Sequence, residues 1–262
     1  MISGVQIADQ SLIDDIDSDL SVSEGFGLFD WDYRPHYTPA NDPENWGLRR
    51  ERQRRNDCQA NALTSCVEVM LHRHRGGLRE LSRMFAYQMS EKFGKGIGRD
   101  RGSSIHAGVK VARDIGIPLE SEYPYNRYTR SRTQFERWYK PVLESAATRK
   151  IVKAIRAPAF SEAVSYVIAG CPIHWASGWP LRWNQDRIVT RYKRRHGSGA
   201  HATAIVWAIE RAGEWLLKVA NSHGDGYFLV NERAYEEIRE NNRWGCYVLQ
   251  GIEQPFQSIS FV

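Results

Sequence analysis

The chain has 262 residues, of which 42% are hydrophobic and 26% charged, and its formal net charge is +5. Such a length can bury a substantial core in one large domain or in two lobes that share an interface. No run approaches the roughly 20 apolar residues of a membrane helix, and Met1–Leu20 lacks the basic and apolar blocks of a secretory signal. We therefore expect no membrane contact and a location in the cytoplasm or in an assembled particle.

The first 28 residues are rich in acidic side chains, including Asp9, Asp14, Asp15, Asp17 and Asp19. This composition predicts a leader, 1–28, that is mobile or docks late as a strap. The stretch Phe29–Pro39 is aromatic and bounded by proline, and we expect it to run extended over the surface of the fold.

The first half of the chain has the spacing of helices. Apolar residues recur with helical periodicity from Asn61 to His74, and Asn56 and Asp57 are positioned to cap that helix. A second helix is expected to start near Ser82. A third is capped by Ser103–Ser104 and ends at Gly116.

The second half contains short β-prone runs separated by turn residues, namely Pro172–Ala176, Ala202–Ile209, Trp215–Ala220 and Tyr227–Val230. A hairpin turn is expected within Glu210–Glu214. Helices followed by strands predict an α+β protein with two lobes.

Four cysteines lie far apart, in no paired or metal-binding spacing, so we expect thiols in a reducing compartment and neither a metal nor another cofactor. Basic residues gather in 127–156 and 187–195. A solvated face explains such runs best, and nucleic-acid contact by 187–195 is at most a side activity.

Cys58, in R-R-N-D-C-Q-A-N-A, falls at a predicted helix start, where the positive end of the helix dipole stabilises a thiolate. The alternative is a buried structural cysteine such as Cys66 on the same helix. Among eight histidines, His201 stands out because small residues surround it in G-S-G-A-H-A-T-A and it opens an apolar strand. Asn221 ends the next strand, so its amide is placed to orient that imidazole.

The order cysteine, histidine, asparagine resembles that of papain-like cysteine peptidases. His201 follows Cys58 by 143 residues (201 − 58), within the roughly 130–150 typical of that family. The intervening motifs resemble its bacterial and phage branch: Leu81-Ser82, Asp100 with Gly102-Ser103-Ser104-Ile105, Gly116-Ile117-Pro118, and Glu120 with Tyr123-Pro124-Tyr125. The similarity extends from about Phe29 to Val230, and Phe29–Arg34 is similar to the family's segment at the mature N-terminus.

The resemblance implies a papain-like two-lobe fold. A helical lobe, 29–125, would be followed by an antiparallel, β-barrel-like lobe, 126–262, with the cleft between them. It implies hydrolysis of a polypeptide substrate through a thioester, with Cys58 as nucleophile, His201 as base, Asn221 as the orienting residue and Gln53 as an oxyanion donor. Substrate backbone would pair beside Gly102, and three alanines would wall a side-chain pocket: Ala176, Ala200 and Ala202.

Four positions depart from the family pattern. Asp57 and Gln59 flank the cysteine where glycine-serine and an aromatic residue are usual, and His223 replaces a tryptophan. Arg52 takes the usual glutamine position, with Gln53 one residue later. A papain-like scaffold retained as a structural or partner-binding component, for example of a phage particle, therefore stays as an alternative. A cell-wall amidase or transglutaminase-like enzyme is a further one, against which Gly102 and the Y-P-Y segment argue.

Overall fold

The computed structural model describes residues 37–49, 52–94, 96–192 and 199–253, together with residues 5, 6, 10, 11, 14 and 34. The expectations for the leader and for Phe29–Pro39 fall almost wholly outside these residues, as do residues 193–195 of the second basic run. Within them, a seven-stranded sheet and a set of helices confirm the predicted α+β class.

The helices that precede the sheet extend further along the chain than the sequence patterns indicated. They are η3 (Pro39–Asn41), α2 (Cys58–Arg75), α3 (Arg83–Phe93), α4 (Ile105–Lys110) with its π-helical continuation η4 (Val111–Ile115), α5 (Arg132–Tyr139), η5 (Lys140–Val142) and α6 (Leu143–Ala147). The hydroxyls of Ser82 and Ser104 accept hydrogen bonds from the backbone of Phe85 and Ala107, which confirms the predicted helix start near Ser82 and the predicted cap at Ser104. Helices continue to Ala147, while the predicted division at residue 125 stays a prediction.

The predicted side-chain cap of α2 is wrong. Asp57 occupies the N-cap position, but its carboxylate makes no capping bond and accepts instead from the Tyr125 hydroxyl at 2.6 Å. The Asn56 amide donates to the backbone carbonyl of Asp100 rather than to the helix. Both side chains thus hold the turn before Cys58 against the helical part. For Asp57, the buried carboxylate is stabilised by a strong donor.

The sheet consists of β1 (Ile151–Arg156), β2 (Ile173–Gly178), β3 (Ile188–Val189), β4 (Ala200–Arg211), β5 (Glu214–Ala220), β6 (Tyr227–Val230) and β7 (Cys246–Ile252). Its order is β1-β7-β2-β4-β5-β6-β3, with β3 parallel to β6 and the other pairs antiparallel, so the sheet is open. The four predicted strands are present. The β4–β5 hairpin turns at Ala212 and Gly213, both with positive φ, as a two-residue hairpin requires.

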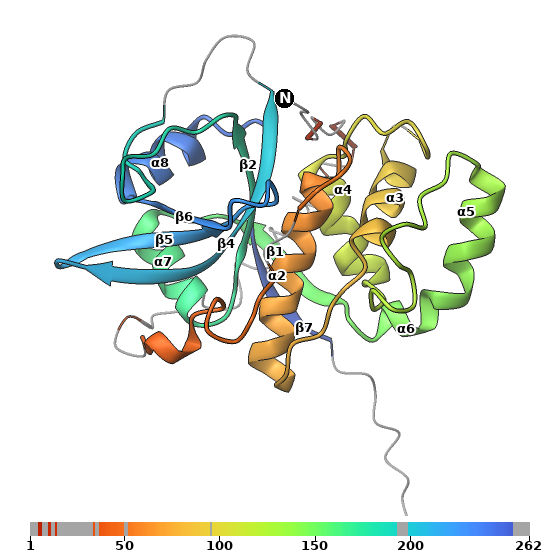
Figure 1. Cartoon of the computed structure of the whole chain (residues 1–262), viewed down its shortest axis with the longest axis horizontal. Helices are drawn as coiled ribbons and strands as arrows, with labels where there is room; N and C mark the ends of the chain where they lie inside the picture. Colours follow the sequence, from red (N-terminus) through yellow and green to blue (C-terminus); the bar gives the residue numbers. More distant parts are fainter. Residues whose placement is uncertain are drawn as a thin grey trace, which may run out of the picture.

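Strand β4 carries small side chains toward one face of the sheet and larger ones toward the other. On β4, Ala202, Ala204 and Val206 pack into the core shared with α2, α3 and α4. Ile205 and Trp207 pack into a second core with α7 (Phe160–Ile168) and α8 (Glu232–Glu240). Figure 1 shows α2 running between the sheet and the remaining helices α3, α5 and α6. Because alanine has only a methyl side chain, α2 can approach β4 closely, which brings its first residue, Cys58, to the strand.

The segment 37–49 ties the sheet to α2 through ion pairs. Lys218 on β5 contacts Asp42 at 2.7 Å and Glu44 at 2.6 Å. Arg49 contacts Glu68 on α2 at 2.6 Å, and Glu68 is almost completely buried. Removing one partner of such a pair leaves an uncompensated buried charge, so this segment holds the sheet and α2 in a fixed relation.

His174 on β2 is a buried histidine directly beneath the start of α2. Its Nε2 donates to the backbone carbonyl of Gln59 at 3.2 Å, and burial lowers the pKa of His174 to about 3. The unfolded chain therefore binds a proton between pH 6.5 and 3 that the folded chain excludes. The contribution of His174 to stability is present above pH 6.5 and is lost as the pH falls toward 3.

We expect the free energy of unfolding to fall between pH 7 and pH 4.5, with His174 accounting for about 2–3 kcal/mol of the loss. The His174→Gln variant lacks the titrating ring, so its urea-unfolding free energy should depend less on pH by that amount, whatever its absolute stability. Parallel pH profiles for the two proteins would contradict the assignment.

Candidate functional site

Cys58 is the first residue of α2 and is fully buried, with its Sγ 3.5 Å from the backbone nitrogen of Ala202. Ala202 directly follows His201 on β4. The contact therefore places the sulphur against the strand that carries the predicted base. At this end of α2 the first backbone N–H groups have no intrahelical partner, and their partial positive charge favours a thiolate.

The orientation of His201 follows from a chain of hydrogen bonds. The Asn221 side-chain nitrogen lies 2.7 Å from a carboxylate oxygen of Asp225, which can only accept. The Asn221 side-chain oxygen must then face His201, whose Nε2 lies 2.8 Å away and carries the proton. Nδ1 is left as the acceptor, and it is buried without a hydrogen-bond partner. This is the tautomer that a base for the Cys58 thiol requires.

Aromatic rings enclose the imidazole of His201. Trp179 packs against it at 4.5 Å between ring centroids, and His223 stacks on it at 4.1 Å. Burial, and then the neighbouring His223, lower the pKa of His201 to about 3, while the bond to Asn221 acts in the opposite direction. The ring is therefore neutral at rest. It is poised to accept a proton rather than holding one.

Gln53 lies next to this group but its amide is engaged. Its nitrogen donates to the Arg55 carbonyl at 3.1 Å, and its oxygen accepts from the Ser222 hydroxyl at 2.7 Å. The backbone of Gln53 also bonds to Ser222, so the segment before Cys58 is held against the loop after β5. An oxyanion role for Gln53 requires release of the bond to Arg55 and stays a prediction.

Gly102 has a positive φ of 86° and donates its N–H to the Tyr87 hydroxyl at 3.3 Å. Val5 forms a parallel bridge with the next residue, Ser103, and the Gln6 backbone donates to the Ser103 carbonyl at 3.1 Å. The Gln6 side chain reaches the Arg101 carbonyl at 2.7 Å. The backbone edge predicted to pair with substrate is therefore paired with the start of the chain.

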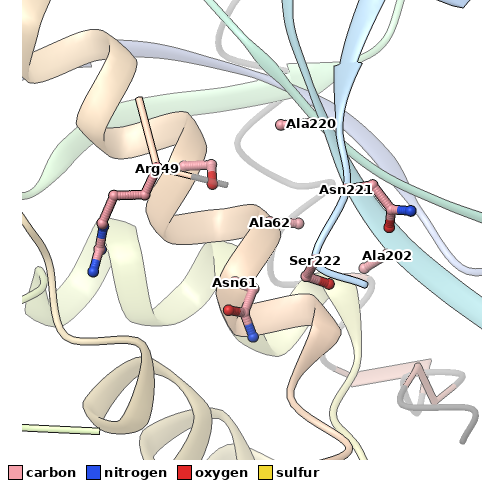
Figure 2. Close-up of a pocket in the computed structure, with 8 residues that line it drawn as sticks. Arg49, Asn61, Ala62, Ala202, Ala220, Asn221 and Ser222 are labelled. Atoms are coloured by element: carbon pink, nitrogen blue, oxygen red, sulfur yellow. The ribbon is translucent and has the colours of Figure 1, made fainter. Parts of the chain in front are cut away.

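Three alanines predicted to wall a side-chain pocket lie inside the core. Ala176 and Ala202 are fully buried and Ala200 is 3% exposed. Ala202 instead lines a pocket of about 10 Å³, enough for about one water molecule, between α2 and the β4–β5 end of the sheet. Its lining includes Ser65 and the residues labelled in Figure 2: Arg49, Asn61, Ala62, Ala202, Ala220, Asn221 and Ser222.

The residues that flank Cys58 are both buried. Gln59 turns toward the helices, where its side-chain oxygen accepts from the Ser103 hydroxyl at 2.7 Å. This position of the Gln59 side chain leaves no room for a side chain at Gly108, because a Cβ there would lie 1.6 Å from the Gln59 amide nitrogen. On the other side of Cys58, burial raises the pKa of Asp57 to about 6, against the opposing effect of the Tyr125 hydroxyl.

Sequence reasoning missed the contributions of Trp179 and Asp225. The tryptophan lies in a loop start without a recognisable motif. Asp225 lies in the turn 224–226, and only the structure shows that a carboxylate four residues after Asn221 reaches its amide. His106 is 4% exposed, and its Nε2 lies 2.7 Å from the Tyr247 hydroxyl.

Solved structures with this architecture are cysteine proteases. Xylellain, a cysteine protease from Xylella fastidiosa, superimposes with a TM-score of 0.60 and 18% identity, over 96% of this chain and 92% of that one. The chain has the fold of the papain-like cysteine proteases. Digestive procathepsin L 3 of Tenebrio molitor matches with a TM-score of 0.58 and 18% identity, over 80% of this chain and 68% of that one. Bromelain from Ananas comosus gives 0.55 and 15%, over 79% and 96%.

No protein-family model and no curated protein matches the chain. The papain-like structures above come from a bacterium, an insect and a plant, so the bacterial and phage branch stays a prediction. Across the described residues, no helix has the length and apolar character to cross a membrane. The same part of the chain holds no cluster of three or more histidine, cysteine or acidic residues suited to a metal ion.

Asp57 should slow thiolate formation at Cys58 only where its carboxylate is ionised, above about pH 6. We expect Asp57→Asn to be alkylated by iodoacetamide at the wild-type rate at pH 5 and about 3- to 10-fold faster at pH 7.5, since a neighbouring negative charge costs ~1 kcal/mol. Mass spectrometry of the Cys58 peptide measures both rates. A rate ratio that does not change with pH would contradict this role of Asp57.

Asp225→Ala should free the Asn221 amide to rotate. We expect the ¹⁵N chemical shifts of His201 to report Nε2–H alone in the wild type and a mixture of tautomers in this variant. Asp225→Asn keeps an acceptor oxygen and should retain the wild-type spectrum. Identical spectra for wild type and Asp225→Ala would show that Asp225 does not set the tautomer.

Proposed function

We propose that the chain is a papain-type cysteine peptidase that hydrolyses peptide bonds through a thioester on Cys58. The single observation that carries this proposal is the hydrogen-bond chain from Asp225 through Asn221 to His201, which leaves Nδ1 as a bare acceptor. The likeness to cysteine proteases supports a peptidase-type fold for the same residues.

In the first half of the reaction, His201 Nδ1 takes the proton of the Cys58 thiol and the thiolate attacks the peptide carbonyl. The imidazolium then gives this proton to the departing amine as the carbon–nitrogen bond breaks. In the second half, water attacks the thioester with His201 as base, releasing the acid and restoring the thiol. A neutral resting imidazole supports this order, because the ring is then free to take the thiol proton before the sulphur attacks.

The negative oxygen of the tetrahedral intermediate needs hydrogen-bond donors. The backbone N–H of Cys58, at the start of α2, is placed to serve as one donor. Gln53 serves as a second after its amide leaves the Arg55 carbonyl. Losing one such donor typically lowers the rate about 10²- to 10³-fold.

We further propose that the helices and the sheet form the two lobes of this fold, the sheet curving as the barrel-like lobe. Substrate would lie between them, with its acyl side along Gly102, where Val5 and Gln6 already show that the Arg101–Ser103 backbone accepts an extended partner. The substrate is a polypeptide.

The second candidate is an inactive papain-like scaffold that binds a partner, for example in a phage particle. Two observations favour it, namely the buried Asp57 carboxyl beside the nucleophile and the engaged Gln53 amide. The two candidates differ in whether the Cys58 sulphur is chemically activated, which a thiol-directed probe measures directly.

We expect a peptidyl epoxide probe to label Cys58 alone at neutral pH. Cys66 is the internal control, since it lies on the same helix and burial raises its pKa well above the ordinary value. His201→Ala should label about 10²- to 10⁴-fold more slowly, and Cys58→Ala not at all. Labelling of Cys246 or Cys66 as fast as that of Cys58 would refute the peptidase and leave the scaffold.

A further inference from the structure

A pocket of about 530 Å³ is lined by residues of the segment 180–192, which follows β2. Its wall includes Pro180, Arg182, Trp183, Thr190, Arg191 and Tyr192. None of these residues belongs to the hydrogen-bonded group around His201. The pocket has the volume of a ligand site rather than of a packing defect.

The pocket is held in place by contacts to the sheet. The Trp183 ring stacks on Phe228 of β6 at 5.6 Å between centroids. The Tyr192 hydroxyl accepts from the backbone of Gly178, the last residue of β2, at 3.1 Å. Two aromatic walls are thus fixed to the sheet, Trp183 to β6 and Tyr192 to β2, so the pocket keeps its shape without a ligand.

The charged groups of the pocket are cationic. Arg182 and Arg191 are exposed, and neither forms an ion pair with any residue in the described part of the chain. Glu237 accepts from the backbone of Tyr192 and pairs with Arg233, and its carboxylate also interacts electrostatically with Arg191. The Asn184 oxygen is occupied by the backbone of Asp186 and Ile188. The charged donors that line the pocket are therefore the two guanidinium groups, which match a carboxylate.

The position of the pocket follows from two contacts of the catalytic pair. On one side, Gln59, the residue after Cys58, touches Ser103 beside Gly102. On the other side, His201 packs on Trp179, which directly precedes the pocket residue Pro180. The departing amine must lie beside His201, which protonates it. When the acyl side of a substrate lies at Gly102, the segment that departs with the amine therefore extends toward the pocket.

We propose that this pocket binds a carboxylate of the leaving segment through Arg182 and Arg191, so that the peptidase selects substrates that are acidic after the cleaved bond. The proposal rests on the peptidase function given above. The carboxylate can belong to an aspartate or glutamate side chain or to the C-terminus of the substrate, and the two sources are separable by experiment.

The test uses quenched fluorescent peptides that are identical before the cleaved bond and carry Glu, Gln or Lys at the three positions after it, each with a free or an amidated C-terminus. We expect the wild type to prefer Glu over Gln about 3- to 10-fold in kcat/KM. A preference that depends on the free C-terminus instead assigns the pocket to the terminal carboxylate. The Arg182→Glu/Arg191→Glu variant should prefer Lys.

The control is Arg132→Glu/Arg137→Glu, which makes the same charge change on α5 and should keep the wild-type preference. Equal cleavage of the Glu and Gln peptides with either terminus, or an unchanged preference in the Arg182/Arg191 variant, overturns the proposal.

Binding separates this proposal from the peptidase function. Fluorescence anisotropy with Cys58→Ala protein should show tighter binding of the Glu than of the Gln peptide. Selective binding without cleavage by the wild type refutes the peptidase and keeps the pocket. Cleavage by the wild type without selective binding of the Glu peptide refutes the pocket and keeps the peptidase function. A single-stranded oligonucleotide that binds the wild type but not the Arg182/Arg191 variant, with no selectivity among the peptides, overturns the proposal in favour of nucleic-acid contact.

Discussion

The close approach of α2 to β4 is the constraint on which the rest of the structure depends. It is possible because β4 presents alanines to the helix and its larger residues to the opposite face. Any bulky side chain at Ala202 or Ala204 would push the helix away and separate Cys58 from the strand that carries His201. The ion pairs of the segment 37–49 reinforce the same spacing from outside.

Burial controls the chemistry of the site as well as its shape. It makes the imidazole of His201 a neutral acceptor, and it raises the pKa of the Asp57 carboxyl to about 6. Hydrogen bonds then fix the orientation of the Asn221 amide and the position of the proton on the His201 ring. Asp225 fixes the amide, the amide fixes the tautomer, and the tautomer leaves one nitrogen for the thiol. The His201 ring is thus uncharged before a ligand binds.

The sequence predicted those elements whose signal is local. The helix start near Ser82, the cap at Ser104 and the hairpin turn at Ala212–Gly213 all depend on residues that are neighbours in the chain. Helix α5 was missed because only Phe135 and Tyr139 are buried on it, too few for a clear periodicity. The Asp57–Tyr125 bond and the packing of Trp179 against His201 join distant segments. No spacing along the chain could predict these two contacts.

The pairing of Gln6 with the Arg101 and Ser103 carbonyls sets a cost for every ligand that uses the same backbone edge. Such a ligand binds only molecules in which the edge is open, so its apparent affinity equals the intrinsic affinity scaled by that open fraction. A sequence change near Val5 that leaves the site untouched would therefore alter the measured strength of every extended ligand by one common factor.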